Sequence, residues 1–388
     1  IFVLALARPE LLERHLDLGG RRASTIHLEP LEDPTMAALV DGLVANLPEA
    51  ARAALVERAD GIPLYAVETV RALIDRDIVV PREGRYVLVP GRESDIESVA
   101  APLSLQALVA ARLDGLSADE KRVVNVASVL GLTFTVPGLL ALGIDADLVE
   151  GTVSSLARKE IFALQTDRFS AELGQYRFLQ SVVRQVAYST QSRRDRKARH
   201  LAAAAYLESL PEHGDDLSVL VAQHLIDASE ASSADDSDMD ELSRRACRHL
   251  QRAARRALTL GATAEAQHLF EQALARTTEP QERAALLLAA SRAALDAGHY
   301  AEGSVLASDA LAQWEELGDD VQAGMAAAQA ARALTLLNDN VSALALGETW
   351  WNRLAGDPAA DLPRLGLAES LARITFQLGD VDRQQYYA

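Results

Sequence analysis

Two stretches in the second half of the chain decide the fold: GATAEAQHLFEQAL at residues 261–274 and GHYAEGSVLASDAL at residues 298–311. Each begins with a turn glycine and continues as an amphipathic helix, and an Ala-Leu pair recurs 37 residues apart within them. Asn338 and Gly379 continue the series of turns at intervals of 40 and 41 residues. A period of this length with paired helices predicts an α-solenoid, in which each helical unit stacks on the next.

The composition agrees with stacked helices and argues against several classes of protein. The chain has 388 residues, more than one ordinary domain needs, and only 5% of them are aromatic. Its 38 basic and 56 acidic residues give a net charge of −18, which argues against a general nucleic-acid or anionic-membrane surface. A single cysteine, Cys247, excludes an internal disulfide framework and predicts a cytoplasmic location. No apolar run reaches the length of about 18 residues that a membrane span needs.

The first part of the chain is predicted to be the end of an α/β core followed by helices. Residues 1–8 form a continuous apolar run, typical of a strand covered on both faces, and a second short strand is expected at 25–28. Helical periodicity then extends from 35 to about 75, interrupted at 59–64, where a glycine ends one helix and a proline begins the next. A small hairpin is expected around residues 81–84. Because the chain opens inside a buried strand, we expect it to be a piece of a longer protein.

The middle of the chain predicts a winged-helix arrangement. Helices are expected at 104–113, 118–130 and 145–159, followed by strands at 161–166 and 175–178. Two more helices follow, at 193–210 and 217–228, and the polar residues 229–240 are the best candidate for a linker.

Taken together, these features resemble the STAND-type signal-transduction ATPases, especially those that follow a class III adenylate or guanylate cyclase domain in large bacterial signalling proteins. The matching words, in chain order, are Ala7-Arg8-Pro9-Glu10, Gly61-Ile62-Pro63-Leu64-Tyr65 with Glu68, Leu105, Ala111-Arg112-Leu113-Asp114-Gly115-Leu116, Ala127-Ser128-Val129-Leu130-Gly131, Tyr176-Arg177-Phe178, Val186-Ala187-Tyr188 and Arg199-His200-Leu201-Ala202. Their order and spacing carry the resemblance, which covers about residues 1–230.

The resemblance implies a mainly α protein in three parts: the end of a P-loop ATPase core with its helical lid (1–98), a winged-helix domain with following helices (99–228) and tetratricopeptide-like repeats (242–388). In the parent protein, Arg8 is expected to approach the terminal phosphate of ATP, because a guanidinium binds phosphate oxygens in a bidentate fork. Gly61 and Pro63 resemble the lid segment whose proline packs on adenine. ATP and Mg²⁺ are the implied cofactors.

The phosphate-binding loop Gly-x-x-x-x-Gly-Lys-Ser/Thr is absent from the chain and is expected upstream. We therefore expect this chain alone to hold no nucleotide tightly, since the backbone nest that cradles the β-phosphate is missing. Ile62 and Tyr65 stand where the family commonly has Asn and Phe, and Leu179-Gln180 stands where it usually has His. An ordinary helix-to-helix turn is the alternative interpretation of the segment around Gly61.

The expected partner is a protein bound to the helical repeats, and possible self-association is left open. Direct nucleic-acid binding is not expected, because the third winged-helix helix carries three carboxylates where a groove-entering helix needs donors. The arginine-rich face of the first repeat helix has two interpretations, a docking face for an acidic partner and, favoured, a solvated face partly neutralised by the acids at 235–241. Its residues are Arg244, Arg245, Arg248, Arg252, Arg255 and Arg256.

No complete catalytic site and no metal site are predicted. The eight histidines lack the spacing of a common ligand motif, and Cys247 has no evident base, so a filler role in helix packing is favoured. The predicted function is regulation of a cyclase through nucleotide state and partner binding. Alternatives are the sensor region of a transcriptional activator with a helix-turn-helix output, a protein kinase regulator, or a scaffold with a decayed ATPase.

Overall fold

The computed structural model describes residues 24, 26–93, 95–96, 104–166, 174–210, 214–233 and 236–387. The chain forms two compact units, Ile1–Gly115 and Leu116–Ala388, which are described separately. The strand expected at residues 1–8 lies outside the described residues. The strand expected at 25–28 is wrong for its described part: residues 26–28 form neither helix nor strand, and Ile26 and Leu28 are 82% and 87% exposed. A strand that buries neither face and pairs with no described neighbour has nothing to stabilise it.

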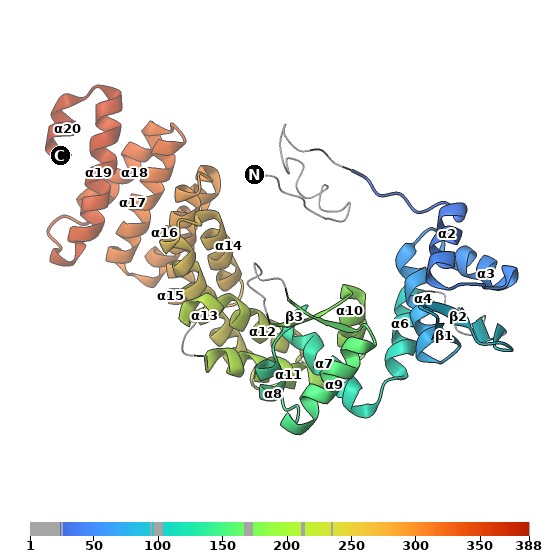
Figure 1. The fold of residues 1–388 in the computed structure, drawn as a ribbon. Helices are drawn as coiled ribbons and strands as arrows, with labels where there is room; N and C mark the ends of the chain where they lie inside the picture. The colour runs from blue at the N-terminus through green and yellow to red at the C-terminus, as the bar shows by residue number, and fades with distance from the viewer. Residues whose placement is uncertain are drawn as a thin grey trace. The chain divides into compact units, whose positions relative to one another are not determined.

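The first unit is a small helical domain with a hairpin (Figure 1). Its elements are α2 (Asp33–Leu43), α3 (Glu49–Ala59), α4 (Pro63–Asp75), β1 (Val79–Arg82), β2 (Arg85–Leu88) and α6 (Leu105–Asp114). The predicted hairpin is confirmed: Val79 pairs with Leu88, and the two-residue turn between the strands has positive φ at Glu83 and Gly84. The core gathers apolar side chains of α2, α3, α4 and β1, such as Met36, Leu55 and Leu73.

A buried ion cluster places α6 in this first unit. Arg112 of α6, with a side chain only 3% exposed, donates from Nη1 to Glu68 Oε2 at 3.0 Å and from Nε to Asp75 Oδ2 at 2.7 Å. Glu68 is fully buried and also accepts a hydrogen bond from Arg71. The unit boundary therefore falls after Gly115, and differs from the boundary at 98/99 that the sequence suggested. The reason is that Arg112 pairs with Asp75, 37 positions earlier in the chain, and with Glu68, 44 positions earlier. No local sequence pattern reveals contacts over such separations.

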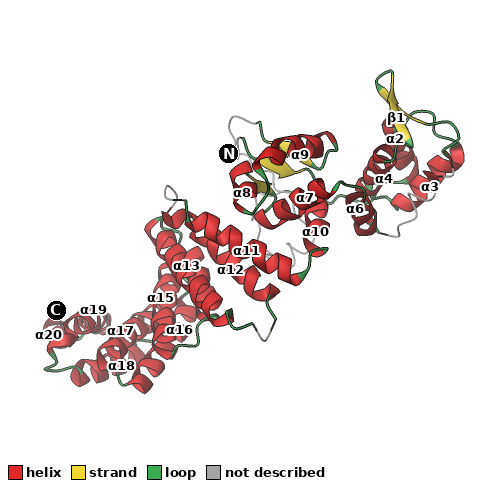
Figure 2. Ribbon diagram, turned by 90° about the horizontal axis from the view of Figure 1, so that it is seen from below, coloured by secondary structure: helices red, strands yellow, loops and turns green. Residues whose placement is uncertain are grey.

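The second unit begins with a three-stranded antiparallel sheet and the helices next to it. Figure 2 shows strands among the helices α7, α8 and α9. Its elements here are α7 (Ala118–Leu130), β3 (Thr133–Phe134), α8 (Val136–Ala141), α9 (Ala146–Arg158), β4 (Phe162–Leu164), β5 (Tyr176–Phe178) and α10 (Ser181–Ser189), with sheet order β3-β5-β4. The expected helices at 118–130 and 145–159 are confirmed, whereas α8 and β3 were not predicted. Both are very short, and α8 contains Pro137 and Gly138, so its sequence looks like a loop.

The rest of the second unit is a stack of helices in which each packs against the next. They are α11 (Arg193–Glu208), η2 (Gly214–Leu217), α12 (Ser218–Ala231), α13 (Met239–Thr259), α14 (Thr263–Leu274), α15 (Pro280–Asp296), α16 (Tyr300–Leu317), α17 (Asp320–Leu336), α18 (Asn340–Arg353), η3 (Pro358–Ala360), α19 (Asp361–Leu378) and α20 (Val381–Tyr387). The predicted turns are confirmed: Gly261, Gly298, Asn338 and Gly379 each lie between paired helices with φ of 76°, 86°, 63° and 76°.

The stack starts earlier than residue 242, because α11 and α12 already pack in series with α13. The segment expected to be a linker is partly helical: residues 229–231 belong to α12 and 239–240 to α13. The connection between them is held to α11, where Lys197 pairs with Asp236 at 2.8 Å and with Asp238 at 2.7 Å. Residues 236–238 are therefore held against α11 at the start of α13.

The junction between α10 and α11 is also anchored. The buried side chain of Gln191 donates to the carbonyl of Asn125 at 3.1 Å, to the hydroxyl of Ser128 at 2.8 Å and to the carbonyl of Ala187 at 2.9 Å. Asn125 and Ser128 belong to α7, so the start of the stack is joined to the sheet-containing part through α7. Across the part of the chain that the structure describes, no helix is both long and apolar enough to cross a bilayer.

Candidate ligand-binding groove

Two of the three residues proposed to bind nucleotide, Gly61 and Pro63, lie among the described residues. Arg8 lies outside the described residues. Gly61 lies between α3 and α4 with φ of 71°, and its carbonyl accepts a hydrogen bond from Leu31 N–H at 2.8 Å. A Cβ at Gly61 would lie 2.5 Å from Pro30 Cβ, so the glycine is needed for this close approach. Pro63 is the first residue of α4 and is exposed beside Ile62, which is 50% exposed.

The helical stack of the second unit contains a groove of about 670 Å³. Alternate helices line it, α13, α15, α17 and α19, with one residue of α14. Its apolar lining includes Leu258, Leu288 and Met325, and also Leu362 and Leu365, which are 65% and 67% exposed. The groove thus offers apolar surface that the stack itself leaves uncovered.

Four arginines lie along this groove, one from each alternate helix. We call Arg255, Arg292, Arg332 and Arg373 the arginine ladder; they lie at intervals of 37, 40 and 41 residues, each six residues before a repeat turn. Repeated helix pairs place equivalent positions on the same face of a solenoid, which explains why all four reach one groove. One carboxylate, Glu369, lines the groove with them.

Two arginines of the ladder have internal partners, and two do not. Arg332 pairs with Asp296 at 3.2 Å, and Arg373 pairs with Glu369 at 2.8 Å, in both cases near the surface. Arg255 and Arg292 are exposed and form no ion pair within the described part of the chain. The amide nitrogen of Gln329, also in the lining, is buried and has no hydrogen-bond partner among the described residues. The groove therefore presents unused donors beside exposed leucines.

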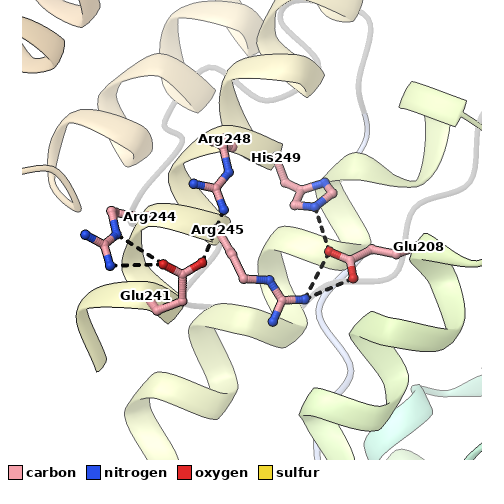
Figure 3. A network of polar contacts seen from close by, with 6 residues as sticks. All are labelled: Glu208, Glu241, Arg244, Arg245, Arg248 and His249. Atoms are coloured by element: carbon pink, nitrogen blue, oxygen red, sulfur yellow. Dashed lines mark hydrogen bonds and ion pairs between the residues drawn. The ribbon is translucent and has the colours of Figure 1, made fainter. Parts of the chain in front are cut away.

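The rest of the arginine-rich face of α13 is neutralised within the unit. Figure 3 shows Arg244 and Arg248 directed toward Glu241, and Arg245 and His249 directed toward Glu208 of α11. Arg252 and Arg256 pair in the same way with Asp215 and Asp216. Three of the four neutralising acids are thus Glu208, Asp215 and Asp216. Only Glu241 belongs to the acidic stretch 235–241 that was expected to neutralise this face. Arg255 alone of the six lines the groove.

The pKa shifts of Glu208 and Cys247 indicate structural roles for both residues. Burial alone would raise the pKa of Glu208, but hydrogen bonds from Arg245 and His249 lower it overall, so the carboxylate stays charged. Burial raises the pKa of Cys247 to about 11, despite the hydrogen bond from Gln251. A buried thiol with this pKa is not a nucleophile at neutral pH, in agreement with the packing role favoured from the sequence.

Helix α9, the third helix in the predicted winged-helix order, presents its acidic residues to solvent. Asp145, Asp147 and Glu150 are exposed, while Val149, Val153 and Leu156 of the same helix are buried. An exposed face with this charge repels the phosphates of a nucleic acid.

The sequence pointed to paired helices but missed the groove residues. The arginine ladder was visible as a repeated position, since the same intervals define the turn residues, yet only Arg255 was singled out, as part of another face. The packing of the helices decides which arginines face the groove. The sequence pattern of a single helix does not reveal this.

Comparisons with known proteins place the chain in no family. No family model matches it, and no curated protein matches it. Among solved structures, it is similar to a STAND protein with a tetratricopeptide repeat sensor from Pyrococcus horikoshii, with 13% sequence identity and a TM-score of 0.33. The similarity covers 96% of this chain and 73% of that one. At this identity and TM-score, the likeness carries no argument, and the fold and function rest on the residues described above.

Proposed function

We propose that the second unit is a receptor for an acidic segment of a partner protein, which binds in the groove along α13, α15, α17 and α19. The arginine ladder is the observation that carries this proposal, because it concentrates positive charge on one face of a chain whose net charge is −18. Guanidinium groups bind carboxylates in a bidentate fork, and the exposed Leu362 and Leu365 would cover apolar side chains of the same segment.

We further propose that this receptor is the regulatory part of a STAND-type signalling protein. The support is the ordered set of short sequence motifs in residues 1–230, together with the helices and the antiparallel sheet that the second unit contains from α7 to β5. In the parent, ATP with Mg²⁺ would be held by the upstream core, with Arg8 at the terminal phosphate and Gly61 and Pro63 at the adenine. The exposed apolar pair Ile62 and Pro63 fits a stacking role.

In this proposal, partner binding controls an output domain, and a nucleotide cyclase is the favoured output. A ligand shifts such an equilibrium only by binding one arrangement better than the other. Sequencing the source transcript outward from both ends decides the output. A phosphate-loop lysine and paired cyclase aspartates upstream support the cyclase. A basic helix-turn-helix downstream, with no cyclase upstream, overturns it in favour of a transcriptional activator.

The receptor proposal is tested by fluorescence anisotropy with the full 388-residue chain. The probes are a fluorescein-labelled peptide that alternates glutamate and leucine and its counterpart with lysine in place of glutamate. We expect saturable binding of the glutamate peptide only, weakened by added salt. The double variant Arg255→Ala, Arg292→Ala should weaken it at least tenfold, as expected when two charge-assisted contacts are lost.

The matched control is Arg244→Ala, Arg248→Ala, which removes two exposed arginines from the same helix, α13, outside the groove. We expect this variant to bind like the parent chain. Equal binding of the lysine peptide, or equal loss in the control variant, would show that the groove does not recognise acidic segments.

A further inference from the structure

Three side chains with ligand atoms meet between α11 and α12, away from the groove. His200 of α11 and His224 of α12 bring their Nδ1 atoms within 3.0 Å of each other, and Asp227 Oδ2 lies 3.7 Å from His200 Nδ1. The three ligand atoms all lie within 4.8 Å of one another. His200 and His224 are buried, at 2% and 9% exposure, while Asp227 is partly exposed and opens the cluster to solvent.

Two of these side chains are oriented by a second hydrogen bond. The Tyr188 hydroxyl lies 2.9 Å from His200 Nε2, the ring nitrogen that does not face the cluster. Gln223 donates to Asp227 Oδ1 at 2.8 Å, which leaves Oδ2 as the oxygen on the side of His200. Outer partners of this kind fix the tautomer of a ligating histidine and the orientation of a ligating carboxylate.

Both imidazoles are available as neutral ligands. Burial lowers the pKa of His200 to about 3 and also lowers that of His224. The charged groups that face the pair are Asp227, which favours a cation there, and Arg184 and Arg196, which oppose one. Arg184 is held by the carbonyl of Ser128, and the Arg196 guanidinium lies over the Tyr188 ring, so both have other contacts.

We propose that His200 Nδ1, His224 Nδ1 and Asp227 Oδ2 bind one divalent transition-metal ion of the zinc type, with water in the fourth position. Two nitrogens and one carboxylate oxygen with an open position are a ligand set that Zn²⁺ accepts. Ligand atoms of a tetrahedral zinc ion lie about 3.4 Å apart, so the two ring nitrogens at 3.0 Å need to separate only slightly.

Binding requires one proton to change position within His200. Without metal, the contact between the two Nδ1 atoms is a hydrogen bond, so one of them carries a proton and the other accepts it. With the Tyr188 hydroxyl donating to His200 Nε2, that proton is on His200 Nδ1. When the metal binds, the proton leaves Nδ1 and Nε2 becomes the protonated nitrogen, which donates to the Tyr188 oxygen. Both rings stay neutral, and the ion joins α11 to α12 at the start of the stack.

No metal site was predicted from the sequence, because His200 and His224 are 24 residues apart on different helices. Only the spacing of His224 and Asp227 can be recognised in the sequence: the two residues are three positions apart and therefore share one face of α12. The second histidine comes from the packing of α11 against α12, which sequence spacing alone does not give.

The test is calorimetric titration of Zn²⁺ into the full chain, prepared without a histidine tag and stripped with a chelator. We expect one ion per chain, a rise in Tm of a few degrees at saturation, and a Co²⁺ complex with the strong visible absorption of a tetrahedral site. Asp227→Asn keeps the shape and the partly exposed position of the side chain, and it should lower affinity at least tenfold while the metal-free Tm stays the same.

The second variant is His224→Gln, and the matched control is His268→Gln, which changes an exposed histidine of α14 outside the cluster. His224→Gln should abolish the Co²⁺ absorption, and the control should bind zinc like the parent chain. Zinc binding that is absent, or that persists unchanged in Asp227→Asn, would overturn the metal site and leave His200 and His224 as a hydrogen-bonded pair. Peptide binding in the groove is a separate measurement, so either proposal can fail alone.

Discussion

In the first unit, Arg112 is buried with the carboxylates of Glu68 and Asp75, whereas in the second unit Arg255 and Arg292 lie exposed along a groove. The same guanidinium group thus meets opposite surroundings. Arg112 pairs with the fully buried Glu68 and the partly exposed Asp75, and its removal would take a buried cation away from Glu68. Arg255 and Arg292 have no such partner among the described residues, so their donors remain available to a molecule from outside. Burial and ion pairing, rather than residue type, therefore distinguish an arginine that stabilises the fold from one that can bind an external ligand.

The largest expected effect is on the buried cluster. Arg112→Ala should destabilise the first unit by about 3–5 kcal/mol, because it leaves Glu68 buried and deprived of its most buried cation. Hydrogen exchange with mass spectrometry, read from the peptide 63–75, measures this loss of stability. Tryptophan fluorescence would not report it, because all three tryptophans lie in the second unit. The control is Arg92→Ala, whose pair with Asp95 is partly exposed and should be worth about 0–1 kcal/mol. Equal protection in Arg112→Ala and the parent would remove the distinction between the two kinds of arginine.

A smaller effect is expected at Glu120, which extends the comparison to a buried carboxylate of the second unit. Burial alone would raise its pKa, but hydrogen bonds from Lys159, Ser117 N–H and Ser155 lower it to about 2. Because the folded pKa lies below the ordinary value of 4.5, the charged form adds up to about 3 kcal/mol of stability above pH 4.5. This contribution is lost as the pH falls from 4.5 toward 2.

Urea unfolding of Glu120→Gln and the parent chain, followed by circular dichroism between pH 7 and pH 3, measures that contribution. The difference between the two proteins should be largest at pH 7 and narrow steadily below pH 4.5. Glu150→Gln, on the exposed face of α9, is the control and should change little at any pH. A difference that does not depend on pH would mean that Glu120 acts through packing rather than charge.

The smallest expected effect is on the stability of the ladder variant. Arg255→Ala, Arg292→Ala should change the free energy of unfolding by less than about 0.5 kcal/mol, since both side chains are exposed and unpaired within the described part of the chain. Thermal unfolding of the full chain measures this. Substantial destabilisation would place both arginines in the fold and weaken the case for a receptor groove, whereas a neutral result makes any loss of peptide binding a direct effect.

Periodic features of the fold could be predicted from the sequence. The turns at Gly261, Gly298, Asn338 and Gly379 repeat a left-handed backbone position, and such positions favour glycine and asparagine in any context. The hairpin at 79–88 was visible for the same local reason. The short α8 and β3 were missed because six and two residues are too few to show a period.

Features that depend on contacts distant in sequence could not be predicted. The assignment of α6 to the first unit depends on Arg112 meeting Glu68, and the histidine cluster depends on α11 packing against α12. The arginine ladder is intermediate: its intervals are in the sequence, but the direction its side chains face is set by the stack. Nucleotide binding by Arg8, Gly61 and Pro63 stays a prediction.

The anchored junction at Gln191 has a mechanical consequence. Its three hydrogen bonds, two of them to α7, hold the start of the stack to the sheet-containing part. The second unit is therefore expected to resist bending at the junction between α10 and α11. A load applied to its far helices would be transmitted as torque to α7 instead of being absorbed by bending at the joint.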